Sequence, residues 1–362
     1  MTTNAPHLDR ARRVAWPTAR IAVVVTVAGL VAWRVDWAGV EEAFQLERWG
    51  FVLLAVLANF ASVVFKGWAW KGVVDGLPSL SRPSRVRDLL SPLLVGFLFN
   101  TVLAARVGEI VKVFLARRRL ERRGEDVRTT VLLGTVVAEN LVATIAWVAF
   151  VFGIGMFLPL PFYAWLTAAV LGAGALAVLL VALLSSPGRQ LPPWLHTGPL
   201  WARARQAAVR FWGAVRESHL GLRDPRQMAL VAGPSLLSWI AQWAGIYCTL
   251  LAFGLDRVGW GGAGLLLVTV TLAQTFPVLP GNLVVFQAAA VLPLTASYGV
   301  ATADALAFSI VLQATEVMVG GALGFVFLLA EGVRFGDLRR EAEAEAHSPA
   351  SAPAAADTFG GP

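Results

Sequence analysis

The stretch that decides the fold covers residues 97–115 and reads FLFNTVLAARVGEIVKVFL. It is mostly apolar, yet it contains Asn100, Arg106, Glu109 and Lys112. The last three follow one another at spacings of three, so on a helix they share one face. Because burying charges in apolar surroundings is costly, such a face in a membrane protein indicates a functional site.

The composition places this stretch in a membrane protein. The chain is 57% hydrophobic and 15% charged, with a mean hydropathy of +0.66, whereas a soluble domain is closer to a quarter charged. Several apolar runs approach the ~20 residues that a helix needs to cross a bilayer. The sequence therefore predicts an all-α polytopic membrane protein.

The composition also excludes several classes of site. A single cysteine, Cys248, excludes a disulfide framework and a multi-cysteine metal site. The four histidines lie outside the apolar runs, at His7, His196, His219 and His347. The expected spans contain no serine–histidine arrangement, aspartate pair or metal-ligand cluster, and the chain has no GxxxxGK[ST] loop. We therefore expect no enzyme activity, no metal and no cofactor.

The charge distribution predicts the orientation of the chain. The net charge of +7 is carried mostly by arginine, which favours contacts with anionic lipid in cytoplasmic loops over nucleic acid. Residues 1–13 are expected in the cytoplasm, before a first span at 14–33. Residues 36–49 predict a short interfacial helix with Trp37 and Trp49 at headgroup depth, followed by a second span at about 50–70.

Residues 89–116 predict a re-entrant hairpin. Arginines lie on both sides of this stretch, so both its ends are expected in the cytoplasm. Its length of about 28 residues is too short for two full spans and a turn. Irregular backbone at membrane depth is tolerated only where protein or a water-filled cavity covers it.

The rest of the chain completes the predicted topology. Further spans are expected at about 129–152, 163–184, 228–253 and 305–330. The arginine-rich segment 185–227 is expected in the cytoplasm with an amphipathic helix at 200–220, and 332–362 as a disordered cytoplasmic tail. A second broken hairpin, 261–299, is interrupted at Pro277, Pro280 and Gly281.

The membrane domain, 14–331, is thus expected to have about six spans and two hairpins that enter from opposite sides. Eight or ten full crossings are the alternative. The hairpin tips also resemble each other in pattern, with Leu-Ala-Ala-Arg-Val-Gly at 103–108 and Leu-Pro-Gly-Asn-Leu-Val at 279–284. Two broken helices, one in each half, are typical of a transporter built as an inverted repeat.

These motifs resemble the lysylphosphatidylglycerol synthase transmembrane-region family, also called the flippase-like domain family. Its first hallmark is an Asn, then Leu-Pro-Gly-Arg-x-Gly-Glu and a basic residue, for which this chain has Asn100, Leu103, Ala104, Ala105, Arg106, Gly108, Glu109 and Lys112. Its second is Pro-Gly-Gly-x-Gly-x-x-Glu followed by Gly-Val, for which the chain has Pro280, Gly281, Asn282, Phe286, Gln287, Gly299 and Val300. The resemblance covers nearly the whole chain.

The chain departs from the family pattern at several positions. Ala104 and Ala105 replace Pro-Gly, and Gln287 replaces the acid of the second hallmark. A Glu-Arg-x-x-Asp pattern is reduced to Glu139, with neutral residues at Asn140 and Ala143. A position in the last helix that is often Arg in the family is Gln313. Four ionisable positions are therefore neutral, which leaves the substrate, and transport itself, open.

The resemblance implies a set of substrate-binding residues: Asn100, Arg106, Gly108, Glu109, Lys112, Glu139, Pro280, Gly281, Asn282 and Gln287. Arg106 would bind a phosphate with its planar guanidinium, and Glu109 would hold that arginine or meet an amine. The alternative is a structural ion cluster, or charges that extend to the cytoplasmic surface. Glu139 and Glu316, inside expected spans, would act as counter-charges or proton carriers, or else pair across the bundle for structure.

The leading functional hypothesis is a flippase-like protein of the inner (plasma) membrane that handles an anionic phospholipid or an isoprenoid-linked lipid. Both termini are expected in the cytoplasm. The alternative is a non-transporting scaffold or accessory subunit of envelope lipid or glycan assembly. Expected partners are anionic headgroups, with an envelope-biosynthesis enzyme or a second copy of the chain left open. About thirty residues follow the last span, too few for an aminoacyl-transferase domain, so we predict no lysylphosphatidylglycerol synthesis.

Overall fold

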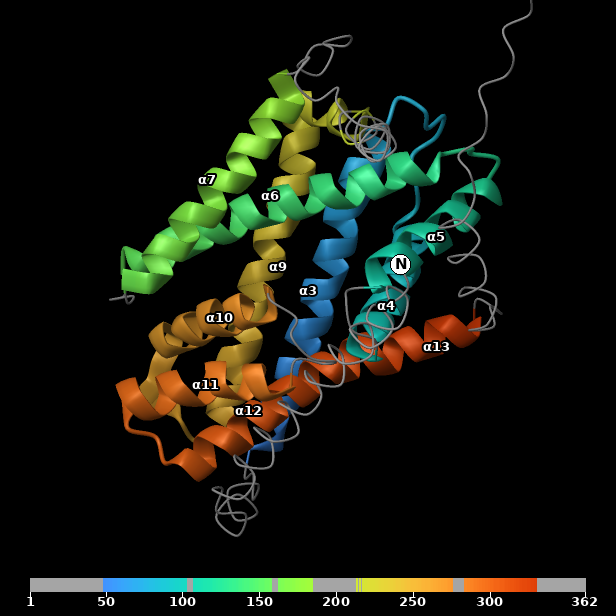
Figure 1. Ribbon diagram of the computed structural model, residues 1–362. Helices are drawn as coiled ribbons and strands as arrows, with labels where there is room; N and C mark the ends of the chain where they lie inside the picture. The colour runs from blue at the N-terminus through green and yellow to red at the C-terminus, as the bar shows by residue number, and fades with distance from the viewer. Residues whose placement is uncertain are drawn as a thin grey trace, which may run out of the picture.

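The computed structural model describes residues 48–102, 107–157, 162–184, 213, 215, 217–275 and 283–330 (Figure 1). The main elements in this part of the chain are helices, as the sequence predicts. They are α3 (Trp49–Asp75), α4 (Val86–Val102), α5 (Gly108–Glu121), α6 (Thr129–Gly155), α7 (Phe162–Leu184), α9 (Pro225–Ala252), α10 (Gly259–Thr275), α11 (Leu283–Tyr298), α12 (Thr302–Val317) and α13 (Leu323–Ala330). The predicted first span, most of the interfacial helix at 36–49, most of the amphipathic helix at 200–220 and the tail lie outside the described residues.

Four helices among the described residues are long and apolar enough to cross a membrane. They are α3, α6, α9 and the continuous helix of 29 residues from α12 to α13, and each lies at a predicted span. The fourth predicted span corresponds to α7, whose apolar part is Trp165–Val181. The protein is therefore an α-helical membrane protein that crosses the bilayer several times.

Helices α3 and α9 pack antiparallel at the centre of the molecule, where Figure 1 shows them side by side. At the start of α3, Arg48 forms an ion pair of 3.1 Å with Asp256, which follows the end of α9. In the middle, the hydroxyls of Ser62 and Ser238 lie 3.0 Å apart. At the other end, the side chain of Gln227 donates a hydrogen bond to the carbonyl of Gly72. These contacts fix the two helices in register along their whole length.

Each central helix is followed by a pair of shorter helices whose outer ends lie together. In the pair α4–α5, Arg123 forms an ion pair of 2.6 Å with Asp88, so the end of α5 meets the start of α4. In the pair α10–α11, Arg257 donates to the carbonyl of Gly299 at 3.4 Å. Because α3 and α9 are antiparallel, the two pairs are attached at opposite ends of the bundle. The chain order of long helix, helical pair and long helix thus occurs twice, in α3–α6 and in α9–α13.

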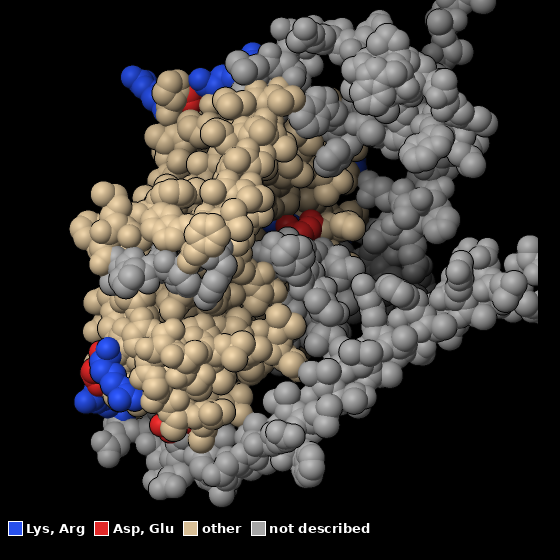
Figure 2. Space-filling view, turned by 60° about the vertical axis from the view of Figure 1, so that its left-hand side comes forward, with Lys and Arg blue, Asp and Glu red and all other residues tan. Residues whose placement is uncertain are grey.

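Apolar side chains fill the two halves and also cover the outside. One buried cluster joins α9 to α12 through residues such as Leu250, Leu266, Phe286 and Phe308. Another joins α3 to α6 through Trp70, Leu89, Leu120 and Leu132. In Figure 2, charged residues gather at the upper and lower ends of the visible face, and the described residues between them are mostly tan, apart from a recessed red acidic group that has blue beside it. Such an apolar band is expected of a surface that contacts lipid.

Not all tryptophans lie at the membrane interface. Trp49, at the start of α3, has 64% of its surface exposed, as an interfacial residue would. Trp70 and Trp147, by contrast, are buried in the bundle. Their positions inside α3 and α6 are set by packing against neighbouring helices, which the amino-acid type alone does not predict.

The last span packs closely against α4 through Gly320 and Gly324. A Cβ on Gly320 would lie 3.1 Å from the Cβ of Phe97, and one on Gly324 would overlap the carbonyl oxygen of Leu94. Within this span, Met318–Ala322 form a π-helical turn. Such turns often mark functional positions.

We predict that Gly324→Ala destabilises the protein, because the added methyl group would lie against the backbone of α4 and 2.8 Å from the Cβ of Leu98. Overpacking of this kind costs about 1–3 kcal/mol. Thermal unfolding in detergent measures the change. Gly233→Ala in α9 is the matched control, since nothing lies within 4 Å of its added Cβ. Equal melting temperatures for the two variants would contradict the packing described here.

Candidate functional site

The tip of the pair α4–α5 is held by a hydrogen bond between its two helices. The side-chain oxygen of Asn100, in the last turn of α4, accepts from the backbone N–H of Gly108 at 2.9 Å. Gly108 is the first residue of α5, so this bond satisfies one of the N–H groups that a helix start leaves open. A Cβ on Gly108 would overlap the carbonyl oxygen of Gly96, and only glycine fits there. Two predicted site residues, Asn100 and Gly108, therefore position the start of α5.

Glu109 and Lys112 form an ion pair on the predicted face of α5. The Nζ of Lys112 lies 2.5 Å from a carboxylate oxygen of Glu109, and only 3% of the lysine side chain is exposed. The other carboxylate oxygen lies 3.4 Å from the side-chain nitrogen of Asn100. The glutamate side chain is 30% exposed. The buried side chain of Lys112 is thus paired with a carboxylate, that of Glu109, which is itself partly exposed.

Helix α3 contributes two residues to this site that the sequence did not indicate. The Nζ of Lys112 lies 5.3 Å from the ring centre of Trp70, in the range of a cation–π contact. Lys66, one turn earlier, lies 5.8 Å from the ring centre of Phe97 and interacts electrostatically with Glu109. Lys66 and Trp70 both lie within α3, which continues to Asp75. Their spacing of four residues, which places both on one face of a helix, is the signal that could have identified them.

Glu139 in α6 is buried without a hydrogen-bond partner among the described residues. It is 1% exposed, and neither carboxylate oxygen has a partner. One turn earlier, Thr135 accepts a hydrogen bond of 3.0 Å from the indole of Trp70, the residue that covers Lys112. An uncompensated carboxylate in such surroundings is costly. Glu139 is therefore suited to meet a cationic or hydrogen-bond-donating group of a ligand.

In the second half of the chain, two neutral residues pair with each other. The side chain of Gln287 in α11 donates to that of Gln313 in α12 at 2.6 Å. These are the positions at which the sequence comparison expects an acid and an arginine. Two departures from the family pattern are therefore in direct contact, joined by an amide–amide hydrogen bond.

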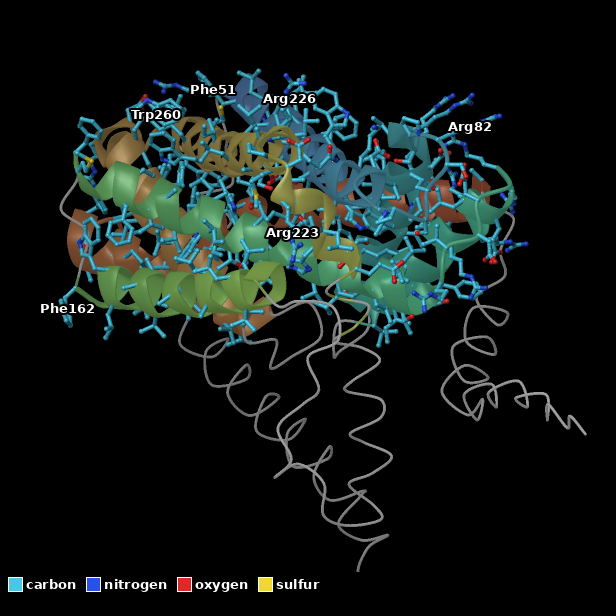
Figure 3. All side chains as sticks on the ribbon, turned by 90° about the horizontal axis from the view of Figure 1, so that it is seen from above. Phe51, Arg82, Phe162, Arg223, Arg226 and Trp260 are labelled. Carbon is cyan, nitrogen blue, oxygen red and sulfur yellow. The ribbon has the colours of Figure 1, made fainter. Side chains whose placement is uncertain are left out.

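The predicted site residues do not form one constellation. Asn100, Gly108, Glu109 and Lys112 lie together, whereas Gln287 belongs to the other half of the molecule. Arg106, Pro280, Gly281 and Asn282 lie outside the described residues. Figure 3 shows polar side-chain atoms gathered toward Arg82, while carbon dominates around Phe162. No group of three or more potential metal-ligating side chains occurs in the described part of the chain.

The neutral positions next to Glu139 have local structural roles. Asn140 donates to the carbonyl of Val136 at 2.9 Å within its own helix, and its side chain lies on an exposed position. The carbonyl of Ala143 accepts a 3.0 Å hydrogen bond from the indole of Trp239 in α9. Neither residue takes part in the Glu109–Lys112 cluster.

Comparison with known families confirms the resemblance. The family described as "Lysylphosphatidylglycerol synthase TM region" matches residues 18–324, and the chain therefore belongs to this family. The match extends over both helical pairs, over α3, α6 and α9, and over the fourth long helix as far as Gly324. A comparison with curated proteins finds no match.

We predict that Lys112→Met lowers the free energy of unfolding by about 2–4 kcal/mol, because it leaves Glu109 beside an apolar group without its counter-charge. Adding Glu109→Gln should recover most of this loss. A double-mutant cycle on unfolding in detergent measures the coupling. Arg48→Met, at an ion pair whose side chains are 48% and 55% exposed, is the control and should cost less than about 1 kcal/mol. If Lys112→Met and Arg48→Met lowered the free energy of unfolding by similar amounts, the Glu109–Lys112 ion pair would contribute no more than an exposed ion pair does.

We also predict that a charged residue at position 287 or 313 is tolerated only when the other position carries the opposite charge. Gln287→Glu or Gln313→Arg alone should destabilise the protein by about 1–3 kcal/mol, because each puts one charge opposite a neutral amide inside the bundle. The double variant, which restores an acid and an arginine, should be more stable than either single variant. Unfolding of all three in the same detergent tests this. Strictly additive losses would mean that the two positions are not coupled.

Proposed function

We propose that this protein, as a member of a family of membrane domains associated with lipids, moves an anionic lipid between the leaflets of the inner membrane. The proposal rests chiefly on the cluster of Lys66, Glu109 and Lys112, which puts two cations around one carboxylate within an apolar bundle. A lipid with a phosphate headgroup fits such a site. Anionic phospholipids and isoprenoid-linked phosphates share this group, and both are candidate substrates.

Each charged residue has a proposed role in holding the headgroup. Lys66 makes no ion pair with any described residue, so its charge is available to a phosphate. Arg106, two positions before Gly108 in the sequence, would add a planar guanidinium that binds phosphate in a bidentate manner. Glu109 would hold Arg106 or Lys112 in the empty state and meet an amine of the headgroup in the occupied state. Glu139 would act as a further counter-charge for cationic groups.

The two helical pairs suggest how the lipid would pass. They are attached at opposite ends of the bundle, and the sequence predicts a break between the two helices of each pair. Transporters built from inverted repeats use broken helices of this kind near the bilayer midplane. We infer that α4–α5 is a re-entrant hairpin entered from the cytoplasmic leaflet. Its counterpart α10–α11 would be entered from the outer leaflet, with Pro280, Gly281 and Asn282 exposing helix ends to the substrate.

The same proposal covers location and partners. Arginines concentrate at the end of the bundle where α3 ends and α4 begins, which the positive-inside rule assigns to the cytoplasm. Anionic headgroups are the proposed ligands, and transport of this kind requires no bond-breaking chemistry and no cofactor. An envelope-biosynthesis enzyme that supplies or consumes the lipid, or a second copy of the chain, are candidate protein partners.

The second candidate function is that of a non-transporting accessory subunit of envelope lipid or glycan assembly. The observation that favours it is the hydrogen bond between Gln287 and Gln313, where an ion pair is expected in relatives. Loss of charge at Asn140 and Ala143 points the same way. A protein of this kind would bind a partner enzyme and leave lipids in place.

We predict that the reconstituted protein exchanges fluorescent phosphatidylglycerol between leaflets faster than protein-free vesicles, and that Arg106→Ala with Glu109→Ala slows this exchange about 10–100-fold. That factor corresponds to the loss of one or two charge-assisted contacts. Phosphatidylcholine, which has no net negative charge, tests headgroup selectivity, and a polyprenyl phosphate tests the isoprenoid alternative.

Arg118→Ala is the matched control, because this arginine is exposed on the same helix. It should retain the wild-type rate. Equal rates for the wild type and the double variant would remove the site assignment. Exchange of neither anionic lipid by the wild type, with co-purification of an envelope enzyme, would support the accessory subunit instead.

A further inference from the structure

A small polar cavity lies between helices α3, α9, α10 and α12, away from the Glu109–Lys112 cluster. Its volume is about 20 Å³, which is enough for one water molecule or one small ion. Half of its lining is apolar or glycine. The polar lining residues are Asn59, Gln242, Thr271, Gln274, Thr315 and Glu316.

Glu316 is the one charged or titratable residue among the described residues that line this cavity. Its carboxylate accepts a 3.0 Å hydrogen bond from the side chain of Gln274. Helices α3 and α9 contribute only the neutral amides of Asn59 and Gln242, and the remaining polar groups are threonine hydroxyls. A carboxylate inside a membrane domain needs a compensating positive charge. No described residue of the lining supplies one, and a bound cation would provide this compensation.

The cavity has the ligands and the location that a cation site requires. Amide, hydroxyl and carboxylate oxygens are the ligands preferred by hard cations. Neither Asn59 nor Gln242 uses its amide in a hydrogen bond to another described residue. The residues Asn59, Gln242 and Glu316 all fall in the middle portion of long membrane helices. Gln274 lies in the last turn of α10, where the negative end of the helix dipole favours a positive charge.

We propose that this cavity binds a single monovalent cation, a proton or Na⁺, on the carboxylate of Glu316. The proton would sit on one carboxylate oxygen while Gln274 donates to the other. Na⁺ would instead be held by the carboxylate and by the amide oxygens of Asn59 and Gln242. The site goes beyond lipid binding, because it uses none of the residues assigned to the headgroup and can be tested without any lipid substrate.

The test uses the full-length protein in lipid nanodiscs without added substrate. Infrared difference spectra recorded during a pH titration in choline chloride report protonated carboxyl groups. Thermal unfolding in NaCl, compared with choline chloride at the same ionic strength, reports Na⁺ binding. Glu316→Gln removes the charge with little change of shape. Glu121→Gln is the matched control, because that carboxylate is 44% exposed and paired with Arg117.

A component of the protonated-carboxyl signal that is present in the wild type and in Glu121→Gln, but missing in Glu316→Gln, would identify a proton site. A melting temperature that rises with NaCl in the wild type but not in Glu316→Gln would identify a Na⁺ site. In that case Asn59→Ala should weaken the apparent Na⁺ affinity about tenfold, which a merely structural role of Glu316 would not cause. If Glu316→Gln changes neither the spectra nor the Na⁺ response, the proposal is wrong. Lipid exchange is measured separately, so failure here leaves the headgroup site untouched.

Discussion

Only 3% of the Lys112 side chain is exposed, and the first half of the molecule is arranged around the ion pair of this lysine with Glu109. Glu109 supplies the counter-charge from the same helix, and Trp70 covers the ammonium from α3. The ion pair is correctly placed only if α5 begins at Gly108, whose N–H is held by Asn100. The close approach of Gly108 to Gly96 then fixes how α5 packs on α4. Burying a charge without a partner is costly, so the need to pair Lys112 constrains how α4 and α5 pack on each other.

Helix α3 connects the two sites of the protein. Asn59, Lys66 and Trp70 are separated by seven and four residues, which places them along one face of the helix. The first of these lines the Glu316 cavity, and the other two surround the Glu109–Lys112 pair. Since α3 also packs along α9, a shift of α3 relative to α9 would alter both sites together. This arrangement offers a physical route by which cation binding and headgroup binding could be coupled.

The two halves of the bundle treat charge differently. In the first half, the carboxylate of Glu109 pairs with Lys112 and interacts electrostatically with Lys66. The second half keeps a neutral amide pair, Gln287–Gln313, and one carboxylate, Glu316, one turn further along α12. In our proposals the first half therefore binds a headgroup and the second a small cation. Two amides in contact carry a lower desolvation cost than an ion pair would at these positions, because neutral groups are easier to bury than ions.

The sequence alone determined the membrane class, the positions of the long helices and the break between α4 and α5. It also placed Glu109 and Lys112 on one face, because hydropathy, charge and helical spacing are properties of neighbouring residues. Tertiary structure alone decided that Lys66 and Trp70 join that face, that Gln287 meets Gln313, and that Glu316 opens into a polar cavity. These contacts join helices that are far apart in the chain. They depend on the register and rotation of packed helices, which no local pattern specifies.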